Sequence, residues 1–142
     1  MNPLKTIAHV CIKTSDLERT LDFYCGGLGL ERQFDFTRGG RVIGFYLKLA
    51  ERSFIEVFEA EEVAAPGANA GLHHFCLETD DMTAVWERLA ERGFAPGEVK
   101  TGADQSLQFW VTDPSGVRFE FHQYTGRSAQ FDGSHRAVEV NW

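Results

Sequence analysis

The sequence predicts an α+β protein in which two tandem βαβββ modules, each a strand, a helix and three further strands, form a cupped mixed sheet. The first observation behind this prediction is an internal repeat: segment 7–17 lies over segment 72–82, with a histidine, a cysteine, a threonine and an aspartate identical. The ends of the copies also agree, because segment 54–58 lies over 118–122 with a glutamate in the same place. The second observation is that each copy opens with alternating apolar and polar residues, as in a half-buried strand, and continues at helical spacing.

Composition agrees with a single domain and excludes some classes of partner. At 142 residues, of which 43% are hydrophobic and 12 are Phe, the chain is long enough to bury a core. A net charge of −7 without a basic patch argues against a nucleic-acid partner. There is no membrane-length apolar run and no signal segment, which predicts a cytoplasmic protein. The three cysteines fit reduced thiols, and the repeat-related Cys11 and Cys76 are interpreted as small residues flanking a site.

The first module is predicted over residues 5–60. Its opening strand places His9, Cys11 and Lys13 on one face and apolar residues on the other. A helix follows, with Ser15 and Glu18 as a capping box, and a group of glycines ends it. Three strands complete the module, with a hairpin turn at 38–41; they are expected at 30–36, 42–49 and 53–58.

The second module repeats this order over residues 72–124, after a linker at 61–71. Its helix is expected to begin at an Asp80 cap and to end at Gly93. Strand signals are weak near Val99 and strong in two segments that a Pro- and Gly-containing turn joins, 107–112 and 117–123. The C-terminal extension, residues 125–142, lies outside the repeat. Its segment 137–140 has the alternation of a short strand. Trp142 and the rest of the extension are expected either to cover a cavity mouth or a partner subunit, or to be solvated.

Two histidines and two glutamates in matching places predict one metal site built by the repeat. Strand alternation places His9, Glu56, His74 and Glu120 on the face away from the helices, the concave face of a curved sheet. Imidazole nitrogen with carboxylate oxygen suits a divalent ion such as Ni, Co, Zn, Fe or Mn, and the ion would offset the cost of two inward carboxylates. His73 competes with His74 for this role, but its parity places it on the helix-facing side as a structural residue.

A set of motifs resembles the vicinal oxygen chelate superfamily, which includes glyoxalase I, methylmalonyl-CoA epimerase, fosfomycin and bleomycin resistance proteins and extradiol dioxygenases. The resemblance covers residues 5 to 124 approximately. The motifs that carry it are His9 with Thr14-Ser15-Asp16-Leu17, Leu21-Asp22-Phe23-Tyr24, Gly27-Leu28-Gly29-Leu30, Ile55-Glu56, His74 with Asp80-Asp81, and Asp113-Pro114-Ser115-Gly116 with Phe119-Glu120. It implies the glyoxalase/bleomycin resistance fold, with a cavity that is often completed in a homodimer.

The resemblance also implies a reaction. With all four ligands in place, the chain is most similar to glyoxalase I and the epimerases, which hold two neighbouring substrate oxygens on a divalent metal and stabilise an enediolate. The implied activity is that of a metal-dependent lyase or isomerase that moves a proton next to a carbonyl. Glu56 and Glu120 are the candidate catalytic bases, and the symmetry of the repeat does not choose between them.

Five side chains are predicted to contact the substrate, a small hydroxycarbonyl compound. They fall on the cavity side by strand parity: Lys13, Gln108, Trp110, Arg118 and His122. Glutathione-dependent relatives usually carry an asparagine a few residues beyond the first glutamate. The segment 58–62 has none and carries three acids instead, which makes glutathione doubtful as a substrate.

Two other functions remain open on the sequence alone. One is an Fe(II) extradiol-type dioxygenase, with His9, His74 and Glu120 as a facial triad and Glu56 beside them. The other is a metal-free drug-binding resistance protein that uses the same cup without chemistry.

Overall fold

The computed structural model describes residues 2–64, 67, 70–133 and 137–140, and it forms two compact units. The first unit covers Met1–Ala65 together with the turn Pro114–Val117. The second covers Pro66–Asp113 together with Arg118–Trp142. Each unit contains one copy of the repeat and its own sheet.

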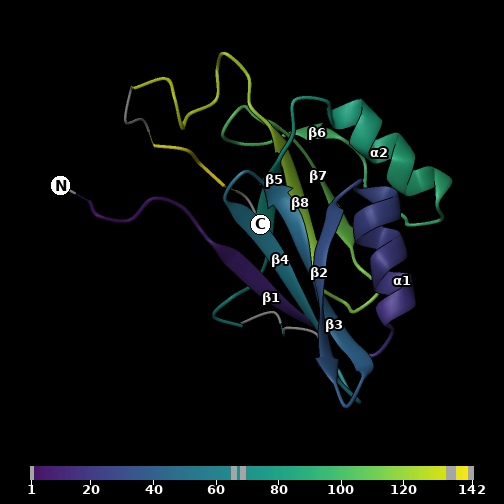
Figure 1. Cartoon of the computed structure of the whole chain (residues 1–142). Helices are drawn as coiled ribbons and strands as arrows, with labels where there is room; N and C mark the ends of the chain where they lie inside the picture. The colour runs from purple at the N-terminus through teal and green to yellow at the C-terminus, as the bar shows by residue number, and fades with distance from the viewer. Residues whose placement is uncertain (1, 65–66, 68–69, 134–136, 141–142) are drawn as a thin grey trace. The chain divides into compact units, whose positions relative to one another are not determined.

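The first unit has the predicted order of strand, helix and three strands. Its elements are β1 (His9–Thr14), α1 (Leu17–Leu21), the π-helical turn η1 (Asp22–Gly27), β2 (Glu31–Arg38), β3 (Arg41–Ala50) and β4 (Ser53–Glu59). The four strands form a mixed sheet in the order β1-β4-β3-β2, in which only the β1 and β4 pair is parallel. In Figure 1, β1 lies alongside β4 at the edge of this sheet.

The second unit repeats this arrangement. Its elements are β5 (Phe75–Glu78), α2 (Met82–Glu91), β6 (Lys100–Thr101), β7 (Leu107–Thr112) and β8 (Arg118–Gln123). The sheet order β5-β8-β7-β6 is that of the first sheet, and again only the first pair, β5 and β8, is parallel. The predicted α+β class and the βαβββ modules are therefore confirmed.

Both helices begin one residue later than the sequence predicts. The N-cap of α1 is Asp16, whose Oδ1 accepts a hydrogen bond from the Arg19 N–H at 2.9 Å, and not Ser15. The N-cap of α2 is Asp81, whose Oδ1 accepts from the Ala84 N–H at 2.9 Å, and not Asp80. An N-cap side chain accepts a hydrogen bond from the backbone N–H two or three residues further on. Where two neighbouring residues can both act as a cap, the sequence does not show which of them makes this bond.

One face of each sheet forms the apolar core. In the first sheet the buried residues, 0–3% exposed, are Ile12, Phe45, Leu47, Ile55 and Val57. In the second sheet they are 0–9% exposed and include Leu77, Phe109, Val111, Phe119 and Phe121. These positions alternate with the predicted site residues, which therefore lie on the opposite face of each sheet.

The C-terminal extension contains no strand within its described residues. The prediction of a short strand at 137–140 is wrong: in the described part of the chain this segment pairs with neither sheet, and the sheets consist of β1–β4 and β5–β8. Trp142 lies outside the described residues. No helix in the described parts of the chain is long and apolar enough to cross a membrane.

Candidate functional site

In the first unit, His9 and Glu56 lie next to each other on the open face of the sheet. His9 is on β1, and Glu56 is on the adjacent parallel strand β4. The His9 Nε2 lies 3.9 Å from the Glu56 Oε2, and their side chains are 46% and 20% exposed. Cys11 pairs with Glu56 in the register, and its thiol is hydrogen-bonded to the carboxylate. Burial and the nearby negative charge of Glu56 raise the pKa of this thiol above its ordinary value.

In the second unit, the corresponding pair is closer together and less exposed. The His74 Nε2 lies 3.3 Å from the Glu120 Oε2, and the side chains are 27% and 12% exposed. His74 directly precedes β5, and Glu120 lies in the middle of the neighbouring strand β8. Each repeat thus brings one imidazole nitrogen and one carboxylate oxygen together.

The second pair has a further imidazole beside it, that of His122. Its Nε2 lies 3.0 Å from the Glu120 Oε1, and its Nδ1 lies 3.9 Å from the Asp104 Oδ2. The Nε2 is fully buried, yet the contact with Glu120 lacks the alignment of a hydrogen bond, and no other described residue provides one. Ligand atoms of Cys76, Glu120 and His122 all lie within 4.8 Å of one another. These donors form a compact group that fits a cation.

Asp104 is fixed by three hydrogen bonds on the far side of His122. Its Oδ1 accepts from the Ser106 N–H at 3.1 Å, and its Oδ2 accepts from the Ser106 hydroxyl at 2.8 Å and from the Gln130 amide at 2.6 Å. Burial works to raise the pKa of Asp104, but the hydrogen bonds from Gln130 and Ser106 outweigh it and hold that pKa below its usual value. Asp104 therefore presents a negative charge to His122.

The pKa of Cys76 is shifted in the opposite direction to that of Asp104. Desolvation, followed by the negative charges of Glu120 and Asp104, raises the pKa of its thiol to about 12. Cys76 and Cys11 are both free thiols, as expected, and count among the exposed residues of the sheet face. At neutral pH Cys76 is a protonated thiol beside two carboxylates.

A pocket of about 460 Å³ opens on this face of the second unit. Trp110 forms one wall, with its ring edge-on to the His74 ring at 4.6 Å and the Arg118 guanidinium carbon 4.0 Å from its centroid. Four of the five predicted substrate contacts line the pocket together with both predicted ligands of this unit: Gln108, Trp110, Arg118, His122, His74 and Glu120. The fifth, Lys13, lies on β1 of the first unit, with its ammonium 4.9 Å from the Phe58 ring centroid.

The interpretation of His73 as a helix-facing structural residue is wrong. His73 is exposed and lines the same pocket as His74, with the two Nδ1 atoms 2.8 Å apart. The physical reason is that β5 begins only at Phe75, so strand alternation does not apply to His73.

Sequence reasoning missed Asp104 and the role of the extension. Asp104 lies in an irregular loop, where no periodicity predicts the direction of a side chain. The signal that could have indicated it is the spacing of two residues to Ser106, which is typical of an aspartate that accepts a hydrogen bond from the nearby backbone. The contact with Gln130 joins residues far apart in the sequence, and nothing in the repeat predicts it.

Known proteins resemble this chain over most of its length. The model of the Glyoxalase/Bleomycin resistance protein/Dioxygenase superfamily matches residues 6–121. A probable lactoylglutathione lyase of Synechocystis sp. is 26% identical over 129 residues, covering 85% of this chain and 97% of that protein. A lactoylglutathione lyase of Neisseria meningitidis is 26% identical over 82% of this chain and 89% of its own length.

A solved structure agrees with these sequence comparisons. The crystal structure of a glyoxalase family protein from Enterococcus faecalis superposes with a TM-score of 0.70, at 25% identity, covering 83% of this chain and 97% of that one. Because the family match extends over both repeats and both pairs of histidine and glutamate, the chain belongs to the glyoxalase/bleomycin resistance protein/dioxygenase superfamily.

Proposed function

We propose that this protein is a divalent-metal-dependent lyase or isomerase that moves a proton at a carbon next to a carbonyl. The observation that carries the proposal is the pairing of an imidazole nitrogen with a carboxylate oxygen in both repeats, at 3.9 Å and 3.3 Å. Relatives named lactoylglutathione lyase, at 26% identity, support the lyase class. The names of the relatives thus support the enzyme class, and the geometry of the site supports the residues proposed to carry out the reaction.

The residues present fit a metal ion. Two neighbouring ligand atoms bound about 2.1 Å from one ion lie about 3.0–3.4 Å apart. The distance of 3.3 Å between His74 and Glu120 fits this range, and 3.9 Å between His9 and Glu56 needs only a small rotation of the side chains. The buried, unaligned Nε2 of His122 is a further donor nitrogen at the same place. His9 with Glu56 in the first unit and His74 with Glu120 in the second are the proposed ligands, and nitrogen with oxygen suits a divalent ion such as Ni, Co, Zn, Fe or Mn.

The side chains of this chain perform the proton transfer. A bound divalent ion would hold two neighbouring substrate oxygens and stabilise the negative charge that develops as the proton leaves. Glu56 or Glu120 accepts the proton from the carbon next to the carbonyl and returns it to the adjacent carbon or to the other face. The remaining carboxylate stays in place to balance the charge of the ion.

The substrate we propose is a hydroxycarbonyl compound other than a glutathione adduct. Glu59, the last residue of β4, and Glu61 and Glu62 just after it are acidic, and an anionic tripeptide would be repelled there. Arg118 offers a cation at the pocket of the second unit, because among the described residues no carboxylate lies within 4.0 Å of its guanidinium. Gln108, Trp110 and His122 from the same pocket would orient the remaining groups, and Lys13 on β1 of the first unit stays a proposed substrate contact.

Metal analysis and isotope exchange test the proposal together. Protein purified without chelator should contain about one divalent ion per site. In deuterium oxide, the metal-loaded protein should exchange the C–H of at least one compound in a panel of 2-hydroxycarbonyl compounds, followed by NMR. Glu56→Gln and Glu120→Gln should each lower the exchange rate about 100-fold to 10,000-fold.

The matched control is Glu51→Gln, in the exposed turn between β3 and β4, which should leave exchange unchanged. Circular dichroism would verify that all variants keep the fold. A protein that takes up no divalent ion, or exchange that survives in both glutamine variants, would contradict the proposal.

A further inference from the structure

The open face of the first sheet carries a set of aromatic rings beside His9 and Glu56. We call this set the aromatic face; its members are Phe34, Phe36, Tyr46, Phe54 and Phe58. The strand register places them there: Phe34 pairs with Tyr46, and Tyr46 pairs with Glu56, so the three side chains lie in one row across β2, β3 and β4. Phe54 and Phe58 flank Glu56 on the same face of β4.

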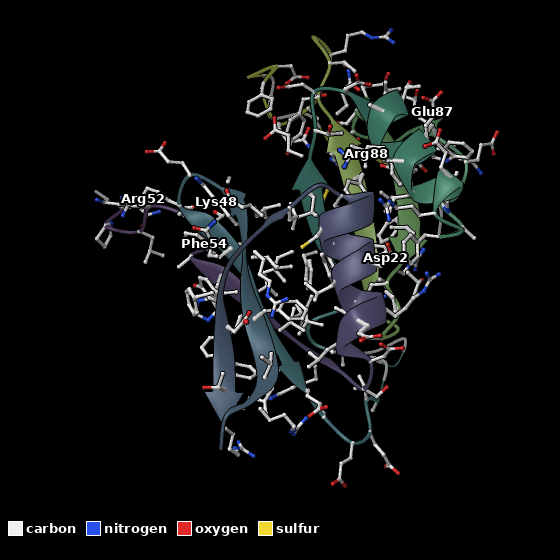
Figure 2. All side chains as sticks on the ribbon, turned by 45° about the vertical axis from the view of Figure 1, so that its right-hand side comes forward. Asp22, Lys48, Arg52, Phe54, Glu87 and Arg88 are labelled. Atoms are coloured by element: carbon white, nitrogen blue, oxygen red, sulfur yellow. The ribbon has the colours of Figure 1, made fainter. Side chains whose placement is uncertain are left out.

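The rings form one continuous surface centred on Tyr46. Phe34 stacks on Tyr46 with ring centroids 4.8 Å apart, and Phe54 stacks on its other side at 5.1 Å. Phe36 meets Phe58 at 4.4 Å. The His9 ring lies 6.1 Å from the Tyr46 ring, so the aromatic face begins where the candidate metal ligands end. In Figure 2, Phe54 and Lys48, which are paired in the register, lie at one end of this sheet.

These rings are accessible, in contrast to the core face of the same strands. Phe45 and Leu47, the neighbours of Tyr46 along β3, are 0% exposed. Phe34 is 50% exposed, and the other members of the aromatic face are half-buried. Contiguous exposed apolar surface is unfavourable in water and commonly marks a ligand site, particularly when polar groups converge at its edge.

The equivalent face of the second sheet is different in character. Positions that correspond to Phe54 and Phe58 in the repeat are Arg118 and His122 there. Only Trp110, the counterpart of Tyr46, keeps an aromatic ring. The duplication has therefore produced one polar, charged face in the second unit and one aromatic face in the first.

We infer that the aromatic face binds an aromatic or other planar apolar group of the substrate, whose oxygens lie at His9 and Glu56. The placement of the oxygens rests on the proposed function; the affinity for a ring rests on the aromatic face alone. A ligand ring packed against the exposed Phe34 ring or the edge of Tyr46 would place an attached hydroxycarbonyl group towards His9, because the His9 and Tyr46 rings are 6.1 Å apart. The substrate class is thus an aryl-substituted hydroxycarbonyl compound and not a small sugar derivative.

Mandelate and lactate provide a matched pair of probes. Both carry the same 2-hydroxycarboxylate, and they differ only in a phenyl against a methyl group. Calorimetric titration of the metal-loaded and of the metal-free protein should give a dissociation constant for mandelate at least about tenfold lower than for lactate. Equal dissociation constants, or no binding of mandelate in either state, would overturn the inference.

Two variants locate the preference on the aromatic face. Phe34→Leu and Tyr46→Leu keep an apolar side chain but remove a ring, and each should reduce the preference for mandelate to about twofold or less. Phe34 is half exposed on the edge strand β2, so its variant should fold as the unmodified protein does. The control is Phe131→Leu in the extension, 71% exposed, which should keep the full preference. An unchanged preference in both variants would overturn the inference.

Metal analysis of the same samples separates the two proposals. A protein that binds a divalent ion but does not distinguish mandelate from lactate would leave the proposed function standing and overturn this inference. A protein that binds no ion and still prefers mandelate would overturn the proposed function and leave this inference standing.

Discussion

At the scale of single residues, His122 makes the two repeats unequal. Its counterpart in the first repeat is Phe58, which cannot contact a carboxylate through a polar atom. In the second repeat both oxygens of Glu120 have an imidazole nitrogen nearby, from His122 at 3.0 Å and from His74 at 3.3 Å. Among the described residues, the polar neighbours of Glu56 are His9, at 3.9 Å, and the thiol of Cys11. Glu120 is therefore the more firmly oriented of the two candidate ligands.

His122→Phe would give the second repeat the residue of the first and should weaken metal binding. Residues that orient a metal ligand typically contribute 10-fold to 100-fold to metal affinity. We therefore expect the affinity for a divalent ion, measured by calorimetric titration, to fall by about that factor. The free energy of unfolding without metal should change less, because the His122 Nε2 makes no aligned hydrogen bond that the variant would lose.

Tyr124→Phe is the control for this variant. The Tyr124 ring lies 5.9 Å from that of His122, and the change removes a hydroxyl from the same neighbourhood without removing an imidazole. It should leave metal affinity unchanged. If His122→Phe also had no effect, His122 would act on the substrate alone; a loss beyond about a thousandfold would instead make it a direct ligand.

At the scale of elements, the sequence predicts most strands and both helices because their patterns are local. Alternation along β4 and β8 correctly places Glu56 and Glu120 opposite the buried apolar residues. The same reasoning fails for His73, because alternation has no meaning before the strand begins at Phe75.

Contacts between distant segments could not be predicted in this way. The approach of Asp104 to His122 depends on how a loop folds over β8. The aromatic face was missed for a similar reason: alternation places Phe54 and Phe58 beside Glu56, but only the register between strands brings Phe34 and Tyr46 into the same row.

Gly44→Ala should destabilise the first sheet. Gly44 lies on β3 between Phe36 and Phe58 in the register, and a Cβ there would come within 2.2 Å of the Val57 carbonyl oxygen. Because that oxygen belongs to the backbone of a central strand, the sheet must shift, which costs about 1–3 kcal/mol. Urea unfolding would measure the loss.

Gly71→Ala serves as the comparison, since a Cβ at Gly71 meets nothing within 4 Å. It should change the free energy of unfolding by less than about 0.5 kcal/mol. Equal effects of the two substitutions would show that backbone freedom, and not the close approach, determines the role of Gly44.

At the scale of the whole molecule, the extension beyond the repeats is a structural part of the second unit. The Thr125 hydroxyl donates to the Gln105 carbonyl at 2.9 Å, and the hydroxyls of Ser128 and Ser106 lie 2.9 Å apart. Ser106 and Gln130 together hold Asp104, which faces His122. A segment without a counterpart in the first repeat thus supports the charged side of the candidate site.

Gln130→Ala should therefore reduce stability in a pH-dependent way. The folded-state pKa of Asp104 is lowered, so this carboxylate stabilises the protein above its unfolded pKa of about 4, and the contribution is lost as the pH falls through the folded pKa. Removing the Gln130 hydrogen bond should cost about 1 kcal/mol at pH 7, and the difference should shrink as the pH is lowered towards 3. Urea unfolding at several pH values would measure it, with Gln33→Ala on the exposed side of β2 as a control that should show no pH-dependent difference. An equal loss at every pH would mean that Gln130 holds the extension by packing, and that Ser106 and His122 rather than Gln130 lower the pKa of Asp104.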